Sequence, residues 1–179
     1  MLKNTRLVFV EALYNIVENK PLDKITVKDI VDYCKSSRQT FYNYFIDKND
    51  LIHWIFQNDQ EEILQIFDLG HSWHEALNQT YQLFCDHKIF YTKIMKEDGQ
   101  NSFISALFEY TKAYYEKSIV RRFGERELTE DLKFCIQFNT YGAVNMCRNW
   151  MLSGMNISPD KMSALIIENM PERLKRYFV

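Results

Sequence analysis

The stretch that decides the fold lies near the N-terminus and reads Thr26-Val-Lys-Asp-Ile-Val-Asp-Tyr-Cys-Lys-Ser-Ser-Arg-Gln-Thr-Phe-Tyr-Asn-Tyr-Phe45. Its pattern predicts two short helices joined by a tight turn, the first with Thr26 as its N-cap and Asp29 in the capping-box position three residues on. Ile30 and Val31 face inward on the first helix. Phe41 and Phe45 face inward on the second. This spacing lets the two helices pack at a steep angle, which is how a helix-turn-helix is built.

The second of these helices, expected over residues 37–45 with Ser37 as its N-cap, presents a polar outward face. Its side chains are of the types that hydrogen-bond to base edges and phosphates in DNA. Because this segment lies so early in the chain, about 130 residues remain for another role. The outward-facing residues are Arg38, Gln39, Thr40, Tyr42 and Asn43.

The rest of the chain also reads as helical. The 179 residues contain only 5 Gly and 3 Pro, which favours long helices over a sandwich or barrel. We therefore expect an all-α fold of about nine helices, divided into a helix-turn-helix domain at 1–47 and a second helical domain at 48–179. Besides the two helices above, apolar periodicity and caps predict helices near 4–19, 48–67, 73–87, 88–95, 102–121, 129–152 and 159–178.

The composition indicates a cytoplasmic protein with a real core. The apolar share is 46% and the aromatic share 15%, yet no run reaches the 18 or more apolar residues of a membrane span. The N-terminus lacks the apolar core of a secretory signal. The four cysteines are scattered, so we interpret them as buried thiols in a reducing compartment.

The charge balance gives only weak support to a nucleic-acid partner. The net charge is −2, and residues 1–50 hold eight basic side chains against seven acidic ones. Contacts with phosphate must therefore come from the local placement of a few groups and not from a basic field over the whole domain.

An enzyme is the competing class, and its signals are weak. His71 and His74 have helical spacing with Glu75 nearby, but no third ligand is spaced to complete a metal site. Cys85 and His87 are too close on one helix to form the usual nucleophile–base pair. The sequence also lacks a phosphate-binding glycine loop. We expect no catalysis, no metal and no cofactor.

The residues around the predicted turn resemble the TetR family of bacterial transcription regulators over positions 4–60. The marks are Thr26-Val27-x-Asp29-Ile30, Ser37-Arg38-x-Thr40-Phe41-Tyr42-x-x-Phe45 and Lys48-x-x-Leu51. The run from Arg38 to Phe45 and the segment Trp150…Ser158-Pro159 are similar to the branch that includes regulators of dihydroxyacetone kinase operons. Two residues depart from the family pattern: Lys35 replaces the usual turn glycine, and Ser36 replaces an aliphatic residue.

The resemblance implies a homodimeric, sequence-specific regulator that binds double-stranded DNA at a near-palindromic operator. We predict base contacts from Gln39, Arg38 and Asn43, since Gln and Asn suit adenine and Arg suits guanine. The resemblance assigns phosphate contacts to other polar groups of the same region. These are Thr40, Tyr42, Tyr44 and Lys48, with the helix end at Thr26, the cap Ser37, and Lys35 near the DNA backbone.

The C-terminal part is expected to hold the effector site and the dimer surface. The candidate effector pocket is lined by Phe84, Phe90, Tyr91, Phe103, Phe108, Tyr110, Tyr114, Phe134, Phe138 and Tyr141. The candidate dimer interface, on the last two expected helices, contains Ile136, Val144, Trp150, Met151, Met162, Leu165, Ile166, Leu174 and Phe178.

Three readings of the regulation stay open at this point. The first is an unknown small-molecule effector. The second is a protein co-regulator, namely a dihydroxyacetone kinase-like subunit, with activation as the output. The third is a helical adaptor that has lost DNA binding, which the weak basic bias and the Lys35 and Ser36 departures favour.

Overall fold

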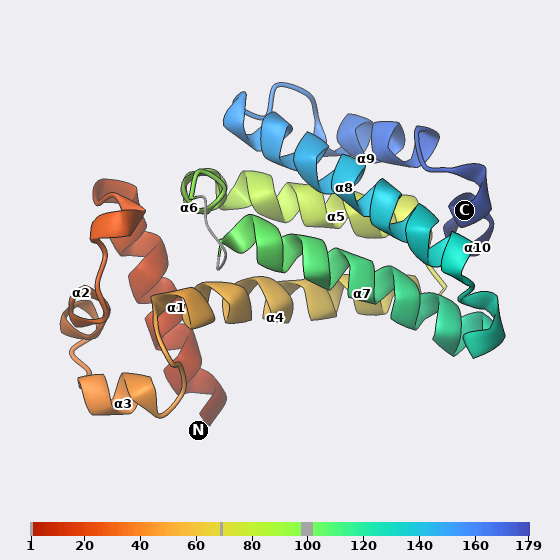
Figure 1. The fold of residues 1–179 in the computed structure, drawn as a ribbon. Coiled ribbons are helices and arrows are strands. Elements are labelled where there is room, and N and C mark those ends of the chain that lie inside the picture. The colour runs from red at the N-terminus through yellow and green to blue at the C-terminus, as the bar shows by residue number, and fades with distance from the viewer. Residues whose placement is uncertain (1, 69, 98–101) are drawn as a thin grey trace.

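The computed structural model describes residues 2–68, 70–97 and 102–179, and this part of the chain is all-α, as the sequence predicts (Figure 1). It contains ten α-helices and two short 3-10 helices, η1 and η2. The α-helices are α1 (Leu2–Asn19), α2 (Val27–Tyr33), α3 (Arg38–Tyr42), α4 (Lys48–Asp68), α5 (Trp73–Asp86), α6 (Lys88–Ile94), α7 (Phe103–Phe123), α8 (Glu130–Leu152), α9 (Pro159–Glu168) and α10 (Glu172–Phe178), with η1 at Leu22–Lys24 and η2 at Glu125–Glu127.

The predicted helix starts near the N-terminus are confirmed by their caps. The Ser37 hydroxyl accepts the Thr40 N–H at 3.0 Å at the start of α3. At the start of α2, Thr26 and Asp29 form a reciprocal capping box. The Lys20 ammonium lies 2.7 Å from the Asp29 carboxylate and, together with the Thr26 hydrogen bonds, lowers the pKa of that carboxyl to about 2. The carboxylate therefore stays charged at neutral pH, which stabilises the cap.

Two expected helix ends are wrong. The single helix expected over residues 159–178 is divided into α9 and α10, because Pro171 has no N–H to continue the helical ladder and instead precedes α10. The helix expected over residues 37–45 ends earlier, since α3 stops at Tyr42 and Asn43 is its C-cap. The division at Pro171 accounts for the tenth helix.

The helices form two regions joined by α4. Figure 1 shows α1, α2 and α3 at one end of the molecule, and α4 running from this end along the length of the remaining helices. Within the second region, α9 packs along α5 and α8 packs along α7. We call α1–α3 the reader and the helices from α5 onward the regulatory bundle, after the roles that the sequence predicts for them. None of the described helices combines the length and apolar character that a membrane crossing requires.

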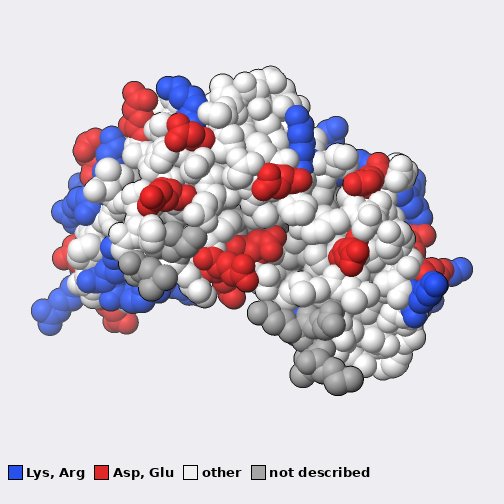
Figure 2. Space-filling model, turned by 180° about the vertical axis from the view of Figure 1, so that it is seen from behind, with Lys and Arg blue, Asp and Glu red and all other residues white. Residues whose placement is uncertain are grey.

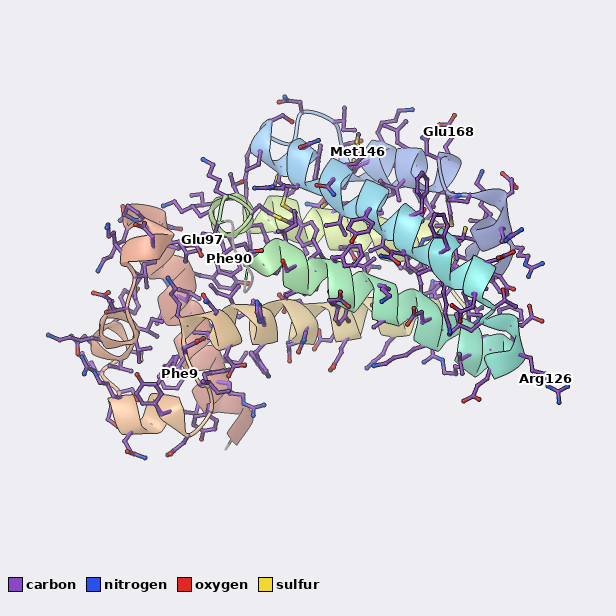
Figure 3. All side chains as sticks on the ribbon, in the orientation of Figure 1. Phe9, Phe90, Glu97, Arg126, Met146 and Glu168 are labelled. Carbon is purple, nitrogen blue, oxygen red and sulfur yellow. The ribbon has the colours of Figure 1, made fainter. Side chains whose placement is uncertain are left out.

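The hydrophobic core is continuous from the reader into the bundle. One cluster of buried side chains includes Phe9 and Phe41 in the reader and Phe90 and Trp150 in the bundle. Figure 3 shows Phe9 within the reader and Phe90 where α6 approaches α1. At this junction the Tyr14 ring of α1 lies edge-on to Phe90, with ring centroids 4.8 Å apart. The orientation of the reader is therefore tied to α6 by packing as well as by the chain itself.

The turn between α2 and α3 places a non-glycine residue in the left-handed region. Lys35 has φ +52°, and the following Ser36 N–H donates to the Val31 carbonyl at 2.8 Å, which closes the end of α2. A side chain with a Cβ costs roughly 1 kcal/mol in this conformation. The positive φ falls at the position where the family pattern that the sequence resembles has glycine.

We predict that Lys35→Gly raises the free energy of unfolding by up to about 1 kcal/mol, because glycine adopts positive φ without steric cost. Urea denaturation of the full chain measures this change. Lys35→Ala is the matched control, since it also removes the long side chain but keeps the Cβ, and it should give no comparable gain. Equal stability of the two variants would contradict the strain at residue 35.

Candidate functional site

The reader is built around an aromatic core that fixes α3. Phe41 is fully buried, and its ring lies edge-on to Phe9 of α1 with centroids 5.3 Å apart. Phe45, just after α3, packs against Phe41 at 5.6 Å and Phe9 at 6.3 Å. Aromatic rings in edge and tilted contacts add specific geometry to apolar burial. The short helix α3 is thus held by rings on both sides of its inward face.

The outward edge of α3 gathers the three side chains predicted to contact bases. Arg38, Gln39 and Asn43 are all exposed. The Gln39 amide donates to Asn43 Oδ1 at 3.4 Å, so these two side chains lie on one edge one helical turn apart. Tyr42 is 55% exposed on the flank of the same helix. The structure therefore leaves all three predicted base-contacting groups on the solvent side of α3, with Gln39 and Asn43 in contact.

The residues predicted to contact phosphate differ in exposure, and several of them already bind other groups of the protein. Lys35 is exposed, whereas Thr40 is half-buried and its hydroxyl lies 2.8 Å from that of Ser37. Tyr44 is half-buried beside Phe9, and the Lys48 ammonium donates to the Leu22 carbonyl. Thr26, as described above, is engaged in the cap of α2.

One basic group near the reader was not anticipated from the sequence. The Arg6 guanidinium lies 5.8 Å from the Tyr44 ring and 5.4 Å from the Trp54 ring, so it joins α1 to the start of α4. On the face shown in Figure 2, Lys and Arg side chains lie mostly toward the two ends of the molecule, whereas Asp and Glu lie both at the ends and in the middle. One of these ends is the reader.

The last turn of α1 is held by a lysine from the bundle. The Lys93 ammonium of α6 donates to the Val17 carbonyl and lies 3.5 Å and 3.4 Å from the carbonyl oxygens of Glu18 and Lys20. These carbonyls belong to a helix end, where intrahelical donors are missing and a cation is favoured. A single charged group thus connects the reader to α6.

The same short helix is held in turn by groups from α8 and from the loop that follows it. Arg148 Nε of α8 donates to the Met95 carbonyl at the end of α6 at 3.1 Å. At the start of α6, the Lys88 ammonium donates to the Gly154 carbonyl at 2.8 Å. Through these contacts α6 connects the end of α1 with α8 and the α8–α9 loop. A polar path therefore runs from the reader to the outer helices of the bundle.

A cavity of about 70 Å³ lies between α4 and the helices α5, α7, α8 and α9 of the bundle. Its wall is mostly aromatic and aliphatic, and none of the described residues that line it carries a charge. Gln60 and Thr80 also line it, and the Thr80 hydroxyl donates to Gln60 Oε1 at 3.0 Å. Three of the side chains expected in the effector pocket lie there: Phe84, Tyr110 and Tyr114.

The other expected pocket residues do not line this cavity. Tyr91 and Phe103 are buried in the core, and Phe90 packs against Tyr14. Phe108 and Tyr141 form a pair in a shallow surface groove, with centroids 4.3 Å apart. Phe134 and Phe138 are 72% and 68% exposed, so the expectation that they line an interior pocket is wrong. The reason is the rotation of α8, whose aromatic stripe faces outward.

The rotation of α8 also places most of the expected dimer residues inside the subunit and not on its surface. All of them except the half-buried Leu165 are buried within the subunit and cannot form a free surface. They are Ile136, Val144, Trp150, Met151, Met162, Ile166, Leu174 and Phe178. The sequence gives both faces of α8 an apolar stripe, and which stripe faces the bundle depends on the packing of α7 against α8.

The outward face of α8, which we call the α8 face, is free of charge along its length. From Phe134 to Leu152 every exposed position of this fully described helix is apolar or neutral. The neighbouring groove between α8 and α9 is lined in part by Met146, Ile157 and Leu165. Figure 3 marks Met146 on α8. The α8 face consists of Phe134, Gln137, Phe138, Tyr141, Gly142, Asn145, Met146, Asn149 and Leu152.

Comparison with known proteins identifies the class. The family model described as the transcriptional regulator C-terminal region of the TetR type matches residues 71–172. This match covers more than half of the chain, so the protein belongs to the TetR family of transcriptional regulators. The family resemblance that the sequence predicted is confirmed.

Within this class the chain is similar to DhaS, as the sequence also predicted. The HTH-type dhaKLM operon transcriptional activator DhaS of Lactococcus lactis subsp. lactis (strain IL1403) is 32% identical over 94 residues, covering 52% of this chain and 50% of that protein. The chain therefore matches about half the length of this curated relative.

Solved structures support the fold. A structure of the dihydroxyacetone kinase operon activator DhaS matches with a TM-score of 0.69 at 24% identity, over 98% of both chains. A TetR-family regulator from Syntrophomonas wolfei str. Goettingen matches with a TM-score of 0.52 at 16% identity, over 99% of this chain and 94% of that one. At these identities the likeness shows the shared all-α architecture.

We predict that Lys93→Met loosens the last turn of α1, because the methionine keeps most of the apolar stem but cannot donate to the carbonyls. Loss of a cation at a helix end should lower the free energy of unfolding by about 0.5–2 kcal/mol. Hydrogen exchange of the amides near residues 16–20 measures the local effect, which should exceed that in α9. Lys96→Met, at an exposed position just after α6, is the control. Equal effects of both variants would contradict a role of Lys93 in holding the end of α1.

Proposed function

We propose that the protein is a sequence-specific DNA-binding transcriptional regulator that acts as a homodimer and is switched through its regulatory bundle. The observation that carries this proposal is the exposed edge of Arg38, Gln39 and Asn43 on a helix fixed by a buried aromatic core. Guanidinium and amide groups at the surface of such a helix suit the donor and acceptor pattern of the major groove. The division at residue 47 between DNA binding and regulation is part of the proposal.

The proposed dimer uses the α8 face. A helix–turn–helix of this size reads only a few base pairs, so specificity requires two readers related by a two-fold axis. A long uncharged surface with exposed Phe134 and Phe138 is unusual for a monomer, because large apolar patches mark interaction sites. At Gly142, no atom lies within 4 Å of the position that a Cβ would take. The centre of this face therefore leaves room for a partner helix.

The proposed switch acts through α4 and α6. α4 begins directly after the reader and supplies part of the wall of the cavity, while α6 binds the last turn of α1 through Lys93. An effector that favours one position of these helices would shift the population between two spacings of the readers. The cavity is the preferred effector site because α4, which leads to the reader, forms part of its wall.

A protein co-regulator is the second candidate for the switch, and the similarity to DhaS favours activation as its output. The name of that relative describes a transcriptional activator of the dhaKLM operon. On this reading the partner is a dihydroxyacetone kinase-like subunit, and the output is activation. A pull-down from a producing strain, followed by a titration of the purified pair, separates this from a small-molecule switch.

We predict that Arg38→Ala weakens binding to the operator by about 1–3 kcal/mol and relaxes the preference at one base pair, because a bidentate base contact is lost. Tyr42→Phe should weaken binding to all sequences evenly, since a phosphate contact carries no sequence information. Titration of operators selected from genomic fragments, with a full set of single-base changes, measures both. If both variants bind the selected operator with unchanged affinity, α3 is not the helix that recognises DNA.

We predict that Phe138→Glu shifts the protein from dimer to monomer by at least tenfold in dissociation constant, because it buries a charge in the proposed interface. Analytical ultracentrifugation over a concentration series measures this. Phe123→Glu is the matched control, as Phe123 is also an exposed phenylalanine but belongs to α7 and not to the α8 face. A wild-type protein that sediments as a monomer at micromolar concentration would overturn the dimer.

A further inference from the structure

We propose that the bundle cavity binds a small uncharged organic molecule whose oxygen accepts a hydrogen bond from the Gln60 amide. This inference rests on the proposed function for its regulatory meaning, since it names the class of effector, but the binding itself is independent of DNA. It depends on three observations: a buried amide group without an acceptor, a wall without charge, and a small volume.

The buried amide belongs to Gln60 on α4. Its side chain is only 4% exposed and occupies the inward stripe of the helix between Phe56 and Leu64. Gln60 Oε1 accepts the Thr80 hydroxyl at 3.0 Å, whereas Gln60 Nε2 has no acceptor among the described residues. A buried donor left without a partner destabilises a protein, so such groups in native structures call for an explanation. A ligand oxygen in the adjacent cavity supplies the missing acceptor.

The uncharged wall determines the charge of the ligand. The ionisable groups of the lining are tyrosines and one cysteine, which carry no charge in their protonated form. Burial raises the pKa of the Tyr110 phenol to about 12, with a further contribution from the charge of Glu61, and raises the pKa of the Cys147 thiol well above its usual range. A carboxylate or ammonium in this cavity would lose its hydration and gain no counter-charge. A neutral ligand is therefore favoured over an acid or an amine.

The volume and the shape of the wall limit the size. The cavity measures about 70 Å³, which is smaller than the roughly 150 Å³ apolar cavity that takes up benzene, so the ligand is no larger than one substituted ring and its entry requires the walls to give way. The Phe56 ring lies edge-on to Tyr110 with centroids 5.1 Å apart, so ring edges and faces are offered to the ligand. A single substituted ring enters once the surrounding helices separate slightly.

That separation gives the ligand its effect on the reader. Gln60 lies on α4, the helix that starts at Lys48 directly after the reader. Thr80 lies on α5, and the hydrogen bond between Thr80 and Gln60 links the two helices across the cavity edge. A ring inserted between them moves α4 relative to α5. Binding therefore biases the position of the reader at the other end of α4.

Calorimetric titration of the full chain with phenol, toluene and benzoate tests the proposal. Phenol and toluene have the same shape and differ in the oxygen, while benzoate carries a charge. We expect phenol to bind and benzoate to bind at least tenfold more weakly. In Gln60→Leu the ratio of phenol affinity to toluene affinity should fall by about fivefold, the value of one hydrogen bond. Gln57→Leu, the same change at an exposed position of α4, should leave the ratio unchanged.

The variant is expected to fold, so its result is informative. Gln60→Leu removes an unpaired buried donor, and Thr80 keeps a hydrogen bond to the Ala76 carbonyl at 3.1 Å. Its melting temperature should equal or exceed that of the wild type.

Three outcomes overturn the proposal: no binding of phenol, equal binding of benzoate, or a phenol-to-toluene ratio that Gln60→Leu does not change. Operator binding is measured separately and without probe. Loss of operator binding with intact phenol binding would reject the proposed function alone, and the converse would reject this inference alone.

Discussion

The contact of Lys93 with the end of α1 is the interaction on which the arrangement of the two regions depends. A helix end exposes carbonyl groups that no residue of the helix itself can satisfy. In α1 these carbonyls receive the ammonium of α6, and α6 is fixed in turn by Arg148 and Lys88. The reader is therefore not an independent domain on a linker. Its orientation is defined by hydrogen bonds at a helix terminus, reinforced by the packing of Tyr14 against Phe90.

The second constraint is the long helix α4, which belongs to both regions. At its start, Leu51 and Ile52 are part of the core that also buries Phe9 and Phe41. Farther along, the same helix supplies Phe56, Gln60 and Leu64 to the cavity wall. A rigid helix transmits a displacement at one end to the other, whereas a loop would absorb it. A change at the cavity and a change in the reader are thus mechanically linked.

Caps and the spacing of apolar residues predicted the helices of the reader well. The side of α8 that is buried depends instead on tertiary packing. The hydroxyl caps at Thr26 and Ser37 and the buried Phe41 and Phe45 follow from spacing alone, and Lys35 adopts the positive φ that a replaced glycine implies. The rotation of α8 did not follow, because both of its sides carry apolar residues, and only the helices packed against it select the side that is buried. The sequence did contain a signal for two features that were missed, because each depends on a polar residue within an apolar stripe. Gln60 on α4 supplies the amide at the cavity, and Lys93 on α6 binds the end of α1.

The neutral α8 face has a consequence for how ionic strength acts on the protein. Binding to phosphate releases condensed counterions and weakens steeply as salt rises. An interface made of aromatic, amide and small side chains has no comparable dependence, and kosmotropic salts strengthen the burial of apolar surface. For the proposed dimer, a rise in ionic strength would therefore release the regulator from DNA as an intact dimer. The dimer could then rebind without first reassembling.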